Sequence, residues 1–206
     1  KLKPWLEQKS QIFADWPAAP DFAVESPRGV LVVGMPGCGK SLTAKATAKL
    51  FGLPLLKMDI GSLMGKYVGE SEGNMRRAIA VAEAVSPCVL WVDEVEKAFA
   101  GIGSGAAGSE VATRLFGYFL TWMQEKTAQV FVVTTANDIS VLPPELLRKG
   151  RFDEIFYVDF PNEAERKAIF RVHLDKRKKM NQQIDLHKLA KATDKYSGAD
   201  IESIVK

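Results

Sequence analysis

The 206-residue sequence has few of the residues that build disulfide-linked or metal-stabilised folds. It contains 2 cysteines, Cys38 and Cys88, and 2 histidines. Two cysteines at unrelated positions provide neither a disulfide framework nor a cysteine-rich metal site. This sparing use of cysteine is typical of a reducing cytosol.

Long apolar runs and strong charge are also missing. No apolar run approaches the roughly 18 residues needed to span a membrane, and no signal peptide is visible. The net charge is only +3, and the single basic cluster, 176–179, follows a predicted helix whose dipole favours cations there. We therefore expect no nucleic-acid partner.

Because the sequence begins at Lys1 and stops inside a predicted helix, we expect it to be part of a longer protein.

The most informative feature that is present is the glycine-rich segment 34–41, which reads GMPGCGKS. It fits the phosphate-loop pattern G-x-x-x-x-G-K-[ST]. A short apolar run at 30–33 predicts a strand before it. A helix is predicted after it, with Leu42, Ala46 and Leu50 on one face. A chance glycine-rich turn would not need this strand and helix on either side.

The residue types of the segment suit a nucleoside triphosphate. Gly37 and Gly39 allow backbone N–H groups to approach phosphate oxygens, and the helix start adds the positive end of a dipole. Lys40 supplies a cation for the phosphates, and Ser41 offers a hydroxyl to Mg²⁺. We expect ATP contacts from Gly34, Pro36, Gly37, Cys38, Gly39, Lys40, Ser41 and Leu42.

A second motif, Asp93-Glu94, ends an apolar run at 89–92 that predicts a strand buried on both faces. Ligands of open α/β sheets bind at this carboxyl edge. Asp93 can hold Mg²⁺, and Glu94 can polarise a water for attack on the γ-phosphate. On its own such a pair is usually a solvated strand end, but a phosphate loop upstream favours the catalytic interpretation.

A third polar residue, Asn137, closes the predicted strand at 130–136. Its amide could orient the attacking water, although Asn137-Asp138 could also simply form a turn. The segment 146–153, LLRKGRFD, follows with two arginines, Arg148 and Arg151. With this spacing the sequence closely resembles the AAA family of ATPases.

The resemblance implies roles for residues that the motifs alone do not explain. Asn137 corresponds to the residue that senses the nucleotide. Arg148 and Arg151 correspond to arginine fingers that act on the nucleotide of a neighbouring subunit, in a ring that is most often a hexamer. In the helical lid, the resemblance assigns nucleotide contacts to His173, Gly198 and Ala199.

The resemblance also points to a substrate-handling loop. Lys66, Tyr67 and Val68 match the central-pore loop with which threading members grip a polypeptide. A surface tyrosine packing on its neighbours is the alternative. Segments such as 86–91 and 116–119 resemble a subgroup encoded as open reading frames in cyanobacterial and algal plastid genomes. We therefore expect a cytoplasmic location, in a bacterial cytosol or a plastid stroma.

Strands alternating with helices predict an α/β fold with a doubly wound, parallel, five-stranded sheet. Past Pro161 only helices are predicted, forming a small lid that the sequence leaves incomplete. The expected domains are an N-terminal helix and linker at 1–26, the α/β nucleotide-binding domain at 27–161 and the helical lid at 162–206.

The predicted function is Mg²⁺-dependent ATP hydrolysis that drives remodelling or unfolding of a protein substrate. Two alternatives remain open: a nucleotide-dependent switch or scaffold that does not thread, and a DNA-handling ATPase. The sequence has no basic stripe with interleaved aromatic residues, which counts against the DNA-handling hypothesis. The family usually has threonine where this chain has Cys38, which leaves a choice between a redox-sensitive thiol and an inert small residue.

Overall fold

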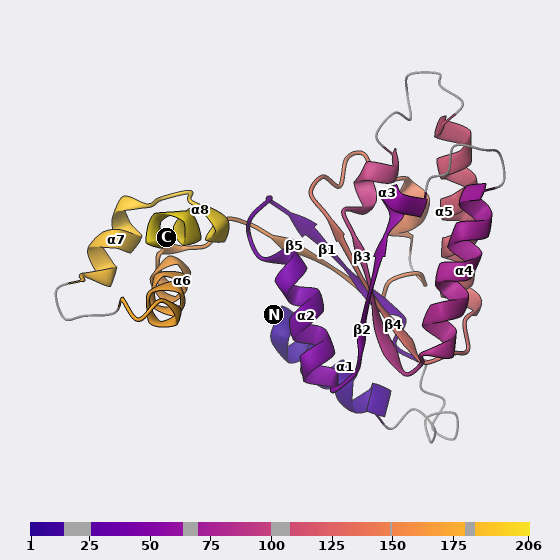
Figure 1. The fold of residues 1–206 in the computed structure, drawn as a ribbon, viewed down its shortest axis with the longest axis horizontal. Helices are drawn as coiled ribbons and strands as arrows, with labels where there is room; N and C mark the ends of the chain where they lie inside the picture. Colours follow the sequence, from indigo (N-terminus) through magenta and orange to yellow (C-terminus); the bar gives the residue numbers. More distant parts are fainter. Residues whose placement is uncertain (15–25, 64–69, 100–107, 149, 180–183) are drawn as a thin grey trace. The chain divides into compact units, whose positions relative to one another are not determined.

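The computed structural model describes residues 1–14, 26–63, 70–99, 108–148, 150–179 and 184–206. Its centre is a five-stranded parallel sheet in the order β2-β3-β4-β1-β5. Figure 1 shows this sheet with helices on both faces. The predicted α/β fold class with a five-stranded parallel sheet is confirmed.

The strands of the sheet are short and mostly apolar. They are β1 (Gly29–Gly34), β2 (Leu55–Asp59), β3 (Cys88–Asp93), β4 (Val130–Ala136) and β5 (Glu154–Val158). The central strands β1 and β4 are buried along their whole lengths, as expected for a parallel sheet covered on both sides. The register pairs Val33 with Ala136 and Val92 with Thr134. The carboxyl ends of β1, β3 and β4 therefore lie together at one edge.

One face of the sheet is covered by α4 (Glu70–Ala84) and α5 (Gly108–Glu125) (Figure 1). These helices bury an apolar stripe at helical spacing, including Met75, Ile79 and Ala82 of α4. From α5 the same core receives Leu115, Phe119 and Met123. Val85 and Tyr118 are exposed and lie outside this core.

The opposite face carries α1 (Leu2–Ala14) and α2 (Lys40–Phe51). Aromatic rings hold these helices on the sheet. The rings of Phe13 and Phe51 lie 6.1 and 4.9 Å from the ring of Phe131 in β4, and Trp5 lies 5.5 Å from Phe156 in β5. Such aromatic pairs add about 0.5–1.5 kcal/mol beyond their buried area. They explain why the predicted N-terminal helix packs on the sheet.

The buried face of α2 differs from the prediction. Leu42 is 65% exposed and Leu50 is 41% exposed, and Ala46 is exposed as well. The helix buries Ala44, Thr47 and Ala48 instead. These small side chains let the helix lie close to the sheet, where leucines would hold it away. The helix was predicted correctly, but its apolar face was assigned to the wrong side.

The structure divides into two compact units, 1–33 with 41–156, and 34–40 with 157–206. The second unit contains α6 (Glu163–Lys176), α7 (Leu186–Ala192) and α8 (Gly198–Val205). Its core is formed by Phe170, Leu174, Leu186, Ile201 and Val205. The domain boundaries given above for residues 27–161 and 162–206 stay predictions.

Local capping fixes where the helices of the second unit begin. Asn162 and Glu165 form a capping box at the start of α6, and Ser197 and Asp200 form another at the start of α8. Asp185 accepts hydrogen bonds from two backbone N–H groups at the start of α7. Within the described residues, no helix combines the length and the apolar character that a membrane crossing requires.

Candidate active site

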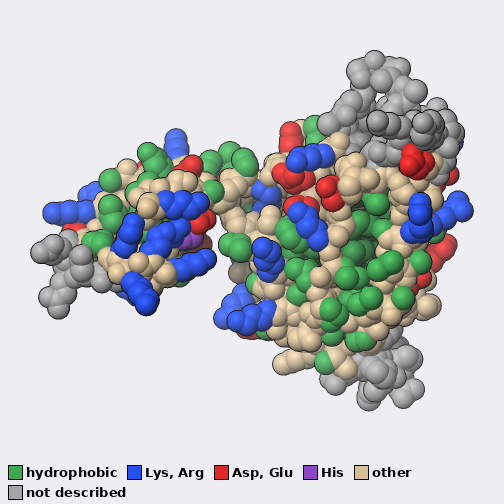
Figure 2. Space-filling model, in the orientation of Figure 1, with side chains coloured by type: hydrophobic (Ala, Val, Ile, Leu, Met, Phe, Trp, Pro, Cys, Tyr) green, Lys and Arg blue, Asp and Glu red, His purple; other side chains and the backbone are tan. Residues whose placement is uncertain are grey.

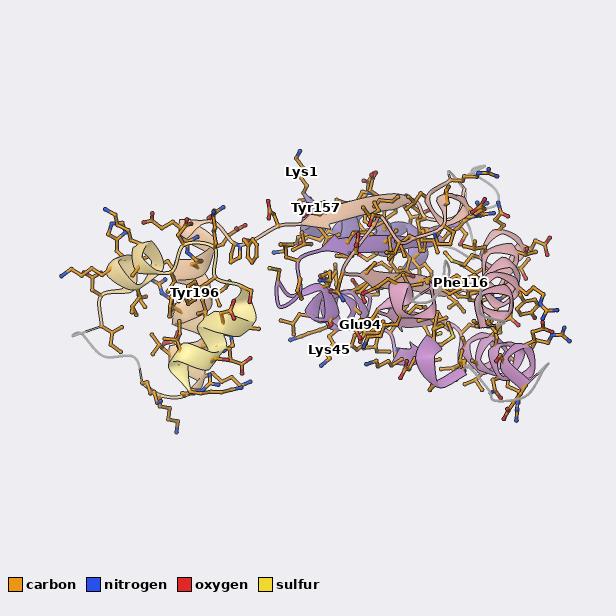
Figure 3. All side chains as sticks on the ribbon, turned by 90° about the horizontal axis from the view of Figure 1, so that it is seen from above. Lys1, Lys45, Glu94, Phe116, Tyr157 and Tyr196 are labelled. Atoms are coloured by element: carbon orange, nitrogen blue, oxygen red, sulfur yellow. The ribbon has the colours of Figure 1, made fainter. Side chains whose placement is uncertain are left out.

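The carboxyl ends of β1, β3 and β4 bring together the polar residues predicted from the sequence. Asp93 is the last residue of β3, Asn137 directly follows β4, and β1 continues into the glycine-rich loop at Gly34. Figure 3, which views this edge from above, labels Glu94. In Figure 2 acidic and basic side chains gather at the top of the unit that contains the sheet.

Thr135 links the two acidic residues of the motif. Its buried hydroxyl donates a hydrogen bond of 2.8 Å to Asp93 Oδ1 and accepts one of 3.2 Å from the Glu94 N–H. Glu94 has a left-handed backbone with a φ of 48°. A residue other than glycine in this region carries about 1–3 kcal/mol of strain, and such strain is often found at functional sites. The Thr135 hydroxyl holds both residues in this arrangement.

Each acidic residue also pairs with a lysine. Lys57 Nζ lies 3.0 Å from Asp93 Oδ2 and 4.5 Å from the centre of the buried Trp91 ring. Lys97, in the 3₁₀ helix η2 (Val95–Phe99), forms an ion pair with Glu94, which directly precedes that helix. The hydrogen bond that Lys97 makes with Glu94 raises the pKa of Lys97, and the negative charge of Glu94 raises it further. The lysines therefore offset negative charge that would otherwise accumulate at this edge.

Asn137 contacts two carboxylates. Its side-chain nitrogen lies 2.6 Å from Glu96 Oε1 and 3.5 Å from Glu94 Oε1. The backbone N–H of Asn137 donates to the same Glu96 oxygen at 3.1 Å. The structure thus brings Asp93, Glu94 and Asn137 together. Glu96 was not predicted as a site residue. Its position three residues after Asp93 could have suggested it, since a turn beyond the strand end places such residues side by side.

Residues 34–40 of the glycine-rich loop belong to the second compact unit. Gly37 and Gly39 have φ values of 75° and 89°, a left-handed backbone that glycine adopts without strain. Lys40, only 6% exposed, donates hydrogen bonds of 2.7 Å to the carbonyl oxygens of Gly34 and Met35. The carbonyl oxygens of the loop therefore hold the Lys40 ammonium in place.

The same unit places Gly37 against the start of α8. The Ala199 N–H donates to the Gly37 carbonyl at 3.1 Å. A Cβ on Gly37 would lie 2.6 Å from Ser197 Oγ, so no other residue fits there without displacing that cap. The predicted contact residues Gly37, Gly198 and Ala199 therefore lie together. His173 of α6 is half-buried, and its Nδ1 lies 3.4 Å from Arg177 Nη1.

Cys38 lies in the glycine-rich loop between Gly37 and Gly39. Burial raises the pKa of its thiol, although the positive charge of Lys40 opposes this effect. A raised pKa leaves less thiolate near neutral pH, and the thiolate is the reactive form. This environment favours the interpretation of Cys38 as an inert small residue over that of a redox-sensitive thiol.

The two predicted arginine fingers differ in exposure. Arg148 is exposed at the end of η3 (Pro144–Leu147), beside a cavity of about 550 Å³ that Lys9 and Arg28 also line. Arg151 has its Nε and Nη1 atoms buried, with no hydrogen-bond partner among the described residues. Arg148 is therefore the more exposed of the two.

This arginine segment is fastened to the start of β1. Asp153 Oδ2 accepts hydrogen bonds from the backbone N–H groups of Arg28 and Gly29 at 2.8 and 3.0 Å. The Arg28 guanidinium in turn donates to the Gly150 carbonyl.

The predicted pore residues Lys66, Tyr67 and Val68 lie outside the described residues, so their roles stay predictions.

The residues present suit Mg²⁺ better than a softer metal. Asp93 and Ser41 offer oxygen ligands, and Mg²⁺ is usually held by one or two carboxylates together with phosphates and water. Among the described residues no cluster of three or more histidine, cysteine or acidic side chains could bind a metal alone.

Comparison with known proteins agrees with the motifs. The model of the family described as "ATPase family associated with various cellular activities (AAA)" matches residues 30–160. This match covers more than half of the chain. The chain therefore belongs to the AAA family, whose members are ATPases that bind nucleotide, normally with Mg²⁺, and typically assemble into rings.

Relatives exist among algae and archaea. The chain is 50% identical over 205 residues to the "Uncharacterized AAA domain-containing protein ycf46" of Pyropia yezoensis, and 47% identical over 206 residues to that of Guillardia theta. These alignments cover 99% and 100% of the chain but only 41% and 40% of the relatives. The "Cell division cycle protein 48 homolog" of Archaeoglobus fulgidus is 35% identical over 185 residues, which are 89% of the chain and 25% of that protein. The resemblance to the plastid-encoded subgroup is confirmed.

Proposed function

We propose that this chain hydrolyses ATP with Mg²⁺ as one subunit of a ring, most simply a hexamer, and that hydrolysis drives remodelling or unfolding of a protein. The observation that carries the proposal is the gathering of Asp93, Glu94 and Asn137 at the carboxyl ends of β3 and β4. The chain spans about two fifths of its algal relatives, so the work done on a substrate is proposed for the whole protein.

The proposed reaction is an in-line attack of water on the γ-phosphate, which breaks the bond to the oxygen that bridges the β- and γ-phosphates and releases ADP and phosphate. Lys40 and the loop N–H groups would bind the phosphates, while Ser41 and Asp93 would hold Mg²⁺, which would supply neutralising charge. Glu94 accepts the proton of the attacking water, and Asn137 aligns that water. Lys97, paired with Glu94 in the structure, has to release the carboxylate for it to act as a base.

The nucleotide contacts beyond the loop are proposed from the lid residues. Gly198 and Ala199 lie at the start of α8, and the Ala199 N–H contacts Gly37, which supports their assignment to the nucleotide site. His173 is assigned there on the family resemblance. We place the protein in a bacterial cytosol or a plastid stroma, on the basis of its relatives and its few cysteines.

Arg148 and Arg151 are proposed to act on the nucleotide of the next subunit. An arginine finger contributes about 10³–10⁵ in rate in phosphoryl transfer, so Arg148→Ala should bind ATP normally and hydrolyse it far more slowly. A Lys40→Ala subunit, itself inactive, still carries its arginines. Mixing it with Arg148→Ala under conditions of subunit exchange should restore part of the phosphate release. Mixtures as inactive as their components would contradict action between subunits.

Tyr67 provides the test of the remodelling role. An aromatic side chain offers contact area to many different sequences, and Tyr67 is not part of the proposed hydrolytic set. In the full-length protein, Tyr67→Ala should keep ATP hydrolysis within a few-fold of wild type and lose unfolding of a tagged fluorescent reporter. Tyr67→Phe, which retains the ring, is the matched control. Hydrolysis without unfolding in the wild type would instead identify a nucleotide-dependent switch.

A further inference from the structure

The carboxylate of Glu96 is the strongest partner of the Asn137 side chain. Glu96 lies in η2, one turn beyond the end of β3, and Asn137 directly follows β4. One oxygen, Oε1, accepts from both the side-chain nitrogen and the backbone N–H of Asn137, at 2.6 and 3.1 Å. The other oxygen, Oε2, is buried and has no hydrogen-bond partner among the described residues. The acceptor capacity of Glu96 is therefore directed mainly at Asn137.

These contacts decide which way the Asn137 amide points. An amide carries donors on its nitrogen and an acceptor on its oxygen, whereas an ionised carboxylate only accepts. Two carboxylates, those of Glu96 and Glu94, lie on the nitrogen side, the second at 3.5 Å. Reversing the amide would place its oxygen, which can only accept, next to both carboxylates, which also only accept. Glu96, with the shorter and charge-assisted bond, makes the larger contribution to this preference.

We propose that Glu96 is a positioning residue for hydrolysis, which holds the amide nitrogen of Asn137 toward the carboxylates and leaves the amide oxygen to accept a hydrogen bond from the attacking water. This inference rests on the proposed function, in which Asn137 aligns that water. Glu96 itself touches neither the water nor the nucleotide. Removing it should lower the rate of the chemical step through Asn137 and leave nucleotide affinity unchanged.

The test is a double-mutant cycle on steady-state ATP hydrolysis by the full-length protein. Glu96→Met keeps the length of the side chain and removes the acceptor, and should reduce kcat by about 10- to 100-fold, in line with the loss of a charge-assisted hydrogen bond. Glu96→Gln, which can accept or donate and so no longer fixes the amide, should reduce kcat by a smaller factor. KM should stay within about twofold in both variants, because ground-state binding is unchanged.

The cycle is completed in the Asn137→Ala background. There, neither Glu96 variant should lower kcat by more than about twofold further, because its route of action is already lost. Glu125→Gln, at an exposed acidic residue that ends α5, controls for the loss of one negative charge. Thermal unfolding separates a folding defect from a rate effect. If Glu96→Met fails to fold, Glu96→Gln carries the same cycle.

Several outcomes would overturn the inference. Equal reductions of kcat with and without Asn137 would show that Glu96 acts by its charge or through another group. A rise in KM with unchanged kcat would indicate a role in binding. If Asn137→Ala hydrolyses ATP at the wild-type rate, the water-aligning role fails and this inference with it. If Asn137→Ala is slow and Glu96→Met is not, the proposed function stands and only the role of Glu96 falls.

Discussion

Glu94→Gln is expected to bind ATP as tightly as the wild type and to hydrolyse it at least about a hundredfold more slowly, because general-base catalysis typically contributes 10²–10⁴. The amide keeps the size of the side chain and cannot take the proton of the attacking water. Glutamine also retains an oxygen that Lys97 can contact, so the local structure should survive. The ATP-bound oligomer should therefore accumulate.

The measurement compares phosphate release with ATP binding for the same preparation of the full-length protein. Glu125→Gln, which removes an exposed acidic side chain at the end of α5, should behave as wild type. Turnover by Glu94→Gln at the wild-type rate would mean that another group prepares the water. Loss of ATP binding would instead assign Glu94 a part in holding the nucleotide.

Lys40→Ala is expected to weaken ATP binding by at least about a hundredfold, which corresponds to about 2.8 kcal/mol. The ammonium is the cation of the glycine-rich loop, and hydrogen bonds between charged partners contribute more than neutral ones. In the structure this ammonium bonds the carbonyls of Gly34 and Met35, so it is already held within the loop. A preordered cation loses little freedom when the phosphates arrive.

Titration calorimetry provides the measurement, and Lys45→Ala is the matched control. Lys45 lies on the same helix, α2, and its side chain is exposed (Figure 3). It should bind ATP as the wild type does. Micromolar affinity retained by Lys40→Ala would remove the assignment of the loop as the phosphate site. Thermal unfolding checks that the loop carbonyls tolerate the loss of their partner.

Local patterns predicted most of the fold. Largely apolar runs at 30–33, 89–92 and 130–136 identified the central strands, because a parallel sheet covered on both faces needs side chains that are mostly apolar. The glycine-rich loop was found for a similar reason, since its backbone geometry demands particular residues at fixed positions. These signals lie within ten residues and do not depend on distant packing.

Several features that depend on contacts far apart in the sequence were not predicted. The Glu96–Asn137 contact joins residues 41 positions apart, and it exists because β3 and β4 are neighbours in the sheet. The buried face of α2 was misassigned because the pattern followed its leucines, whereas the helix packs by small residues such as Ala44. The left-handed backbone of Glu94 left no signal, since this conformation is set by its surroundings and not by its residue type.

The most direct test of ATP hydrolysis is a single-turnover experiment with labelled ATP and an excess of the full-length protein. We predict that bound ATP is converted to ADP and phosphate when Mg²⁺ is present and stays intact when Mg²⁺ is chelated. The rate should rise with protein concentration if, as proposed, Arg148 and Arg151 act on the nucleotide of a neighbouring subunit. ATP that remains intact on an oligomer with Mg²⁺ present would contradict the proposal.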